Sequence, residues 1–366
     1  MNNTVTAIKV NQKYGNTESD TMTRELLEKL SNAHGLTSAE GNIRDIIKKE
    51  LKGYVDEMYE DKLGNLITVK KGDNFKFMLA SHMDEIGFMV QYIDEKGFIK
   101  FVPIGGWYAP TAYTQRVILH GTKGDVVGVI GAKPPHVMSP EDRKKELKIE
   151  EFFIDIGAKD AADVEKLGIE IGTPITVDRE LKDLANGKVT GKALDNRVGV
   201  ALQIEVLKKV KSPHTIYGVF TVQEETGLKG AKVSAFAINP DCAIATDVTI
   251  PGDHPGITKK DASVEMGKGP VLVLVSAAGR GLIADTKLTN WLRKAGDKNK
   301  IPYQLEVGDG GNTDASIINL VNAGIPSIPF SIASRYIHSP VEVIDMKDLE
   351  DGVKLLVEAL KTKPKF

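Results

Sequence analysis

The stretch TIYGVFTVQEE, residues 215–225, joins an apolar run to two adjacent acids. β-Branched and aromatic residues dominate Thr215 to Val222, which predicts a buried strand. Glu224 and Glu225 follow at its carboxyl end, where open α/β sheets bind their ligands. Two neighbouring carboxylates repel each other unless a cation or a shared proton compensates. The stretch therefore predicts an α/β sheet with a metal site at its edge, although an isolated Glu-Glu pair is more often part of a solvated turn.

The composition narrows the class of protein. A chain of 366 residues exceeds one ordinary core, so we expect two domains. Lys and Arg total 48 against 50 Asp and Glu, and this balance gives no electrostatic signal for nucleic acid. Cys242 is the only cysteine, which excludes an internal disulfide and fits a reducing compartment. No apolar run approaches the roughly 20 residues of a membrane helix, and the N-terminus lacks the apolar core of a signal peptide. We therefore expect a cytoplasmic protein that binds neither nucleic acid nor membrane.

The order of elements predicts an α/β fold with an inserted β-rich domain. Short segments with turn signals, typical of a small β domain, run from Gly87 to Asp178. We therefore divide the chain into a flexible polar tail (1–20), an α/β domain (21–84 and 183–366) and an insert (85–182). Expected strands cover 65–69, 75–80, 215–222, 242–246, 269–275 and 325–330. Expected helices run from a cap at Asp20 to Gly35, along the apolar stripe of residues 43–51, within 139–150, and over 191–210, 286–295, 313–321 and 349–360.

Residues with metal-ligand chemistry stand at the ends of the predicted elements. His82 and Asp84 follow a strand, Asp195 opens a helix, Asp247 ends another strand, and His338 lies in a loop after the last strand. One imidazole or carboxylate per crossover is what a metal site on a doubly wound sheet requires. Each residue also has a structural alternative: a core histidine, a helix cap, a turn or a surface loop.

Five segments with these residues stand in order along the chain: SHMDEIG (81–87), ALDNR (193–197), QEETG (223–227), ATD (245–247) and RYIHSP (335–340). Together they resemble the motifs of the M42 metallo-aminopeptidases, a family that includes glutamyl aminopeptidases and tetrahedral peptidases. The resemblance extends from about Thr23 to Leu360. It implies an α/β/α catalytic domain with a central mixed sheet, of the phosphorylase/hydrolase-like type found in zinc peptidases, and an inserted small β-barrel-like domain for oligomerisation.

The resemblance also implies roles for single residues. Two divalent ions, zinc or cobalt, are implied, each held by one histidine and one carboxylate. His82 and Asp247 are the ligands of one ion, and Glu225 and His338 are the ligands of the other. Asp195 lies between the two ions and is shared by them. Glu224 matches the general base, and Asp84 matches the residue that orients His82. Manganese suits ligands of these types as well.

A glycine-rich stretch, GGNTDA (310–315), matches the family's segment beside the substrate pocket. We therefore expect Gly311, Thr313 and Asp314 to line that pocket. Asn312 stands where the family has another glycine, which leaves the shape of the pocket open. A helix N-cap at Asn312 is an equal alternative.

The activity implied is hydrolysis of N-terminal residues from peptides, with Glu224 transferring a proton from the water to the leaving amine. The family also implies dimers that assemble into a dodecamer. Three alternatives stay open. They are a related di-metal hydrolase (a carboxypeptidase or an N-acyl amino-acid deacylase), a glycosidase of the endoglucanase type with two carboxylates, and a peptide-binding scaffold without catalysis. The side chain preferred at the N-terminus of the substrate is not indicated.

Overall fold

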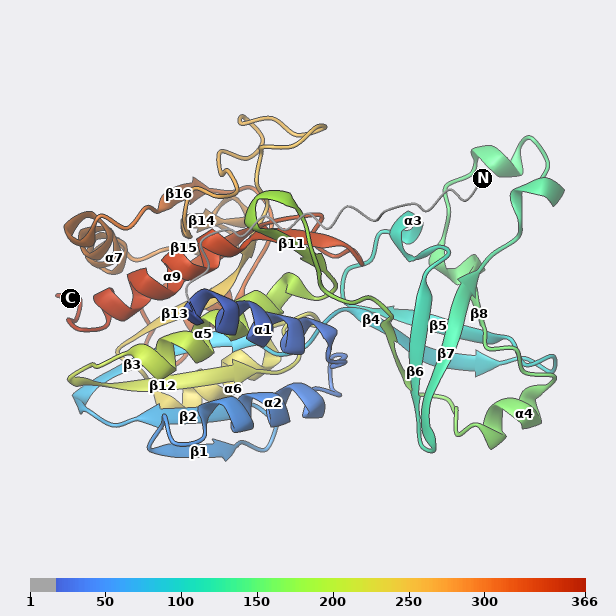
Figure 1. Ribbon diagram of the computed structural model, residues 1–366, viewed down its shortest axis with the longest axis horizontal. Coiled ribbons are helices and arrows are strands. Elements are labelled where there is room, and N and C mark those ends of the chain that lie inside the picture. Colours follow the sequence, from blue (N-terminus) through green and yellow to red (C-terminus); the bar gives the residue numbers. More distant parts are fainter. Residues whose placement is uncertain (1–17) are drawn as a thin grey trace, which may run out of the picture.

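The computed structural model describes residues 18–366, and Figure 1 shows them in two parts, a helix-covered sheet and a smaller β-barrel. Residues 1–17, most of the predicted tail, lie outside the described residues. The first helix, α1 (Glu18–Asn32), begins before the expected cap at Asp20 and ends before Gly35. Acidic residues are favoured in the first turn of a helix, so the Glu-Ser-Asp segment extends α1 instead of capping it. Among residues 18–366, no helix is long and apolar enough to span a bilayer.

The central sheet is mixed, and parallel strands form its middle. These lie in the order β12 (His214–Thr221), β3 (Asp73–His82), β13 (Cys242–Thr249) and β17 (Ser327–Arg335). The register pairs His82 with Thr221, so β3 and β12 end at the same edge of the sheet. Further strands extend the sheet: β1 (Glu57–Glu60), β2 (Leu66–Lys70), β10 (Lys182–Asp183), β11 (Lys188–Gly191), β14 (Val271–Ser276), β15 (Leu282–Ile283), β16 (Gln304–Val307) and β18 (Glu342–Asp345).

Helices cover both faces of this sheet, because its middle strands are apolar on both sides (Figure 1). Along β3, Phe77 and Leu79 enter one core, whereas Met78 and Ala80 enter the other. The first core lies under α1, α2 (Gly41–Leu51), α5 (Leu194–Lys209), α7 (Thr286–Asn299) and α9 (Met346–Ala359). The second lies under α6 (Lys229–Ile238) and α8 (Asp314–Ile318).

The smaller part is a closed barrel whose strands follow the order β4 (Gly87–Ile93), β5 (Ile99–Ile104), β8 (Phe153–Asp155), β7 (Gly124–Gly131), β6 (Arg116–Gly121) and β9 (Pro174–Val177). Two short helices accompany it, α3 (Ala109–Ala112) and α4 (Ala161–Lys166). Phe88, Phe101 and Ile154 are buried inside. The mixed sheet between helix layers and the closed barrel confirm the predicted fold class.

The sequence patterns were wrong about one segment and missed two elements. The helix expected within residues 139–150 is wrong, because this stretch holds 3₁₀ turns at Asp142–Lys144 and Ile149–Glu151. The segment is charged and has no apolar stripe that a helix could bury. The sequence patterns also did not indicate α6 or β18. Leu228 provides no side-chain cap for α6, and Glu342 interrupts the apolar pattern of β18.

Candidate metal centre

The candidate ligands gather where the parallel strands end. His82 is the last residue of β3, and Glu224 and Glu225 follow β12. Asp247 lies near the end of β13, and His338 lies in the connection between β17 and β18. Because β12, β3, β13 and β17 run parallel as neighbours, their carboxyl ends meet at one edge.

The carboxylate of Asp195, in the first turn of α5, lies between the two histidines. Its Oδ1 is 3.2 Å from Nε2 of His82, and its Oδ2 is 3.4 Å from Nε2 of His338. Oε2 of Glu225 is 3.3 Å from Nε2 of His338, and Oδ1 of Asp247 is 3.9 Å from Nε2 of His82. The structure thus brings each expected ligand pair together, on opposite sides of Asp195.

Glu224 belongs to the same cluster. Its Oε2 lies 3.9 Å from Nε2 of His82, at the same distance as the nearest oxygen of Asp247. Ligand atoms of these three residues lie within 4.8 Å of one another, as do those of His82, Asp195 and Glu225. Distances alone would therefore also allow Glu224 to be a ligand.

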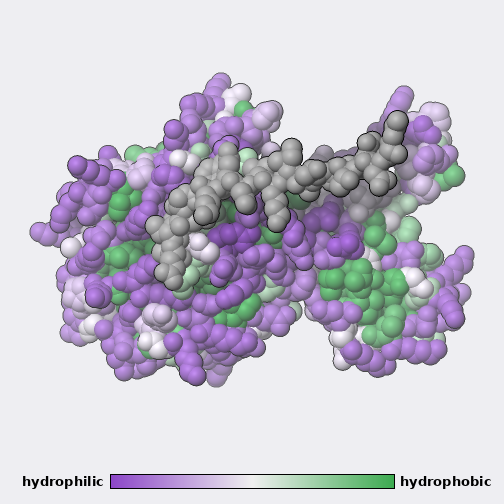
Figure 2. Space-filling view, viewed as in Figure 1, coloured by the Kyte–Doolittle hydropathy of each residue, from purple (hydrophilic) through white to green (hydrophobic). Residues whose placement is uncertain are grey.

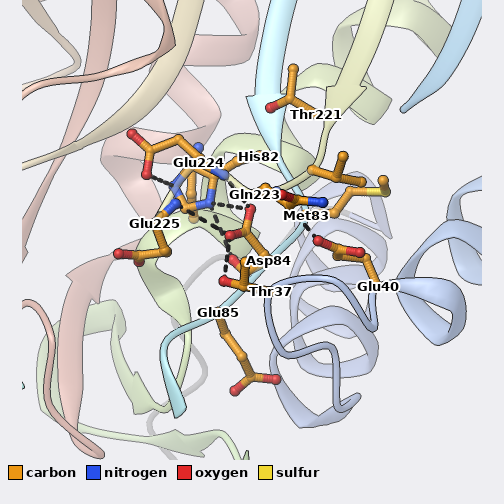
Figure 3. Close-up of polar contacts among 12 residues, drawn as sticks. Thr37, Glu40, His82, Met83, Asp84, Glu85, Thr221, Gln223, Glu224 and Glu225 are labelled. Atoms are coloured by element: carbon orange, nitrogen blue, oxygen red, sulfur yellow. Dashed lines mark hydrogen bonds and ion pairs between the residues drawn. The ribbon is translucent and has the colours of Figure 1, made fainter. Parts of the chain in front are cut away.

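The turn that carries the two glutamates is fixed by buried carboxylates (Figure 3). The amide of Gln223 donates to Oε1 of Glu40 at 3.3 Å. The amides of Glu224 and Glu225 donate to the two oxygens of Asp84, at 3.1 and 3.2 Å. Asp84 therefore orients both glutamates through their backbone.

Asp84 also lies against His82. Nδ1 of His82 is 3.1 Å from the backbone oxygen of Asp84 and 3.5 Å from its Oδ1. The Thr37 hydroxyl donates to Oδ2 of Asp84 at 2.7 Å. Burial alone would raise the pKa of Asp84, but the contacts with His82 and the Thr37 hydroxyl hold it below its ordinary value. An ionised Asp84 can serve the imidazole and the glutamate turn together.

The chemistry of the donor set fits divalent metal ions. Burial raises the pKa of both Glu224 and Asp247 well above their ordinary values, and neighbouring carboxylates add to the effect. Added positive charge would keep these carboxylates ionised, and a bound cation supplies it. Imidazole nitrogens combined with carboxylate oxygens suit zinc, cobalt and manganese.

The glycine-rich stretch lies beside this cluster. Thr313, and not Asn312, is the N-cap of α8, since its hydroxyl accepts from the amide of Ala315. The alternative that Asn312 caps this helix is therefore wrong by one residue, and α8 ends at Ile318, earlier than predicted. Asp314 is buried, and its Oδ2 accepts from the Thr221 hydroxyl at 2.5 Å. Gly311 has a φ of 73° and is exposed. That Gly311, Thr313 and Asp314 line a substrate pocket stays a prediction.

The sequence did not indicate that a segment next to the barrel lies close to the candidate site. A Cβ atom on Gly106 would lie 2.8 Å from Nδ1 of His338, so only glycine fits beside the undisplaced imidazole. The next residue, Trp107, donates from Nε1 to the oxygen of Gly87 at 3.0 Å and stacks on Phe88. The Gly-Gly-Trp triplet between β5 and α3 was the available signal, because paired glycines often mark close backbone approach.

A second missed feature is a buried ion cluster next to the site. Both oxygens of Glu85 accept from Nζ of Lys192, at 2.9 and 2.8 Å, and Oε1 also accepts from Arg197 at 3.2 Å and from the amide of Gly35 at 2.9 Å. Glu85 points away from Asp84 and the glutamate pair (Figure 3). Burial lowers the pKa of Lys192 to about 8. The available signal was that Glu85 and Arg197 stand in the same sequence segments as candidate ligands.

Known proteins resemble this chain in sequence and in fold. The family model described as M42 glutamyl aminopeptidase matches residues 64–355. The lysyl aminopeptidase of Pyrococcus furiosus is 35% identical over 92% of this chain and 97% of its own. The solved structure of an aminopeptidase from the archaeon Desulfurococcus kamchatkensis is 40% identical, with a TM-score of 0.91 over 95% of this chain and 96% of its own. The TET1 peptidase of Pyrococcus horikoshii, which can assemble into a tetrahedron or a large octahedral shell, is 32% identical, with a TM-score of 0.82 over 93% of this chain and 99% of its own.

Proposed function

Because the chain belongs to the M42 peptidase family of glutamyl aminopeptidases, we propose that it removes N-terminal residues from peptides with the help of two divalent metal ions. The single observation that carries the two-ion assignment is the position of Asp195, whose two oxygens face the two histidines separately. We assign His82 and Asp247 to one ion, Glu225 and His338 to the other, and Asp195 to both. Zinc or cobalt suits these ligands.

We assign acid–base catalysis to Glu224. Two divalent ions bound by these residues would supply Lewis acidity, to polarise the scissile carbonyl and lower the pKa of water. Oε2 of Glu224 faces this cluster from a position 3.9 Å from Nε2 of His82. Its carboxylate takes the proton of the attacking water and delivers it to the nitrogen of the leaving amine. Asp84 keeps Glu224 in position, because Oδ1 of Asp84 accepts a hydrogen bond from the backbone amide of Glu224.

The test compares two isosteric variants of adjacent residues. Glu224→Gln should keep both ions and its melting temperature but lose about 10²- to 10⁴-fold in kcat, because a proton carrier is missing. Glu225→Gln should instead lose an ion, which elemental analysis of the purified protein measures. If Glu224→Gln loses metal as readily as Glu225→Gln, Glu224 is a metal ligand and the assignment of acid–base catalysis to it is wrong.

Substrate chemistry distinguishes the proposal from its alternatives. An aminopeptidase should cleave peptides with a free N-terminal amine and spare their N-acetylated forms, whereas a deacylase or carboxypeptidase should show a different preference. A glycosidase that depends on two carboxylates should keep its activity after chelation of metal. A panel of aminoacyl chromogenic substrates, run with several added metals, would also define the preferred N-terminal side chain.

We further propose that the barrel, within residues 85–182, mediates assembly of dimers into a dodecamer. Figure 2 shows an apolar area on the barrel. Among residues 85–182, exposed apolar side chains include Val127, Val129 and Ile171. Apolar side chains grouped on a surface are typical of protein interfaces. Such an assembly would confine the sites and admit short or unfolded peptides.

A further inference from the structure

Glu342 is a buried carboxylate that joins the backbones of two candidate ligands. It is the first residue of β18, directly after the loop that carries His338, and its side chain is 2% exposed. Its Oε2 accepts from the amide of Asp195 at 2.8 Å, and its Oε1 accepts from the amide of His338 at 2.9 Å. Glu342 and Asp195 are 147 positions apart in the sequence. One side chain therefore links α5 to the β17–β18 connection at the point where both supply a ligand.

This bridge requires an acceptor at both side-chain oxygens. An ionised carboxylate only accepts hydrogen bonds, whereas a glutamine offers one accepting oxygen and one donating NH₂ group. In a glutamine at position 342, the NH₂ group would face one of the two backbone N–H donors. A buried carboxylate so close to Asp195 carries a cost in desolvation and repulsion. The two backbone hydrogen bonds reduce that cost without cancelling it, because burial and the charge of Asp195 still raise the pKa of Glu342 well above its ordinary value.

His338 depends on this bridge more than Asp195 does. Its backbone has a φ of 59°, in the left-handed region that residues other than glycine rarely adopt. Its side chain is 36% exposed, against 10% for Asp195. Asp195 lies in the first turn of α5, and its side chain contacts both histidines. Without Glu342, the loop would lose the hydrogen bond that holds its histidine toward Asp195.

We propose that Glu342 is a positioning residue that sets the separation of His338 from Asp195, and with it the affinity for the ion on the His338 side. This inference rests on the proposed two-ion site. It differs from a general contribution to stability, because it concerns one of the two ions and leaves the His82 side largely unchanged.

The experiment titrates the metal-free full-length protein with Co²⁺, followed by calorimetry and by visible absorption. The wild type should bind two ions. Glu342→Gln should keep one at nearly unchanged affinity and bind the second roughly 10- to 100-fold more weakly, since a hydrogen bond to a charged group is lost. Glu342→Asp, whose shorter side chain cannot span both amides, should show the same selective loss and serves if the glutamine variant does not fold.

Asp348 provides the matched control. It is 0% exposed and, like Glu342, accepts two backbone hydrogen bonds, from Gly267 at 2.7 Å and from Gly269 at 2.6 Å. None of these groups is a candidate ligand. Asp348→Asn should lower the melting temperature and leave both Co²⁺ affinities unchanged.

The outcomes of this titration distinguish a failure of the proposed role of Glu342 from a failure of the proposed two-ion site. A wild type that binds fewer than two Co²⁺ ions would overturn the two-ion site and this inference with it. If the wild type binds two ions and the Glu342→Gln or Glu342→Asp variant also binds two with unchanged affinity, the proposed role of Glu342 is wrong. The proposed two-ion site would not be affected by that result. Equal weakening of both ions, or an equal effect of Asp348→Asn, would also overturn it.

Discussion

Replacing Glu85 with glutamine should destabilise the protein strongly, because this carboxylate is the acid that contacts two buried cations. Glu85, Lys192 and Arg197 are all nearly inaccessible, with side chains that are 3%, 3% and 0% exposed. The substitution keeps the shape of the side chain but leaves both cations without their direct ionic partner. Lys192 can respond by losing its proton, since burial already lowers its pKa to about 8. Arg197 cannot, because a guanidinium stays charged in proteins.

The magnitude follows from this arrangement. Removing one partner of a buried ion pair costs about 3–5 kcal/mol. Arg197 keeps hydrogen bonds to the backbone oxygens of Met83, Leu30 and Ala33, so we expect about 4 kcal/mol. At about 2.1 cal/mol/K per residue, a chain of 366 residues that unfolds as one unit has an unfolding entropy of roughly 0.8 kcal/mol/K. The melting temperature should therefore fall by roughly 5 °C.

The assay is thermal unfolding at pH 7, with two companion variants. Glu57→Gln removes the acid of a surface pair with Lys71, whose side chains are 49% and 64% exposed, and should leave the melting temperature unchanged. Adding Lys192→Met to Glu85→Gln removes one unpaired cation, so the double variant should be more stable than Glu85→Gln. A melting temperature of Glu85→Gln within about 1 °C of the wild type, or a double variant no more stable than the single, would refute the reasoning.

The pH dependence provides a further check on the same variant. Burial would raise the pKa of Glu85, but Lys192 and Arg197 lower it below its ordinary value of 4.5. A carboxylate with a lowered pKa in the folded state contributes stability above its unfolded-state pKa. That contribution is lost as the pH falls through the folded-state pKa, so the difference between wild type and Glu85→Gln should be complete at pH 7 and should narrow well below pH 4.5.

Three other outcomes follow from the site and the barrel. Gly106→Ala should displace the imidazole of His338 and lower kcat/KM at least about tenfold. Gly41→Ala, whose Cβ would meet nothing within 4 Å, should leave kcat/KM unchanged. Equal kcat/KM values for the two variants would contradict the close approach of Gly106 to His338. Asp195→Ala should weaken both ions in a metal titration, whereas His82→Ala should weaken mainly one, and full metal content in Asp195→Ala would exclude a shared ligand. Sedimentation at micromolar concentration should give an oligomer, and a fully active monomer would contradict the proposed assembly.

Local patterns in the sequence carried most of the information about the fold. The apolar run over 215–222 predicted β12, and similar runs predicted β3, β13 and β17, because strands buried on both faces need continuous apolar residues. Short segments with turn signals predicted the small β domain, whereas its barrel-like form was implied by the family resemblance. The helix predicted within the charged stretch 139–150 was wrong, and β18 was not predicted because its apolar pattern is interrupted.

The candidate ligands could be identified from the sequence because each stands at the end of a predictable element, and carboxyl ends of parallel strands meet whatever the details of packing. Their mutual arrangement could not. The resemblance implied that Asp195 is shared, but only the tertiary structure shows how its two oxygens face the histidines, that Glu342 joins Asp195 to His338, and that Gly106 leaves no room for a Cβ atom beside the imidazole. The periodicity of a sequence encodes which residues are buried within one element. The approach of two side chains from distant elements depends on strand register and on the path of the loops, which are set by packing of the whole chain.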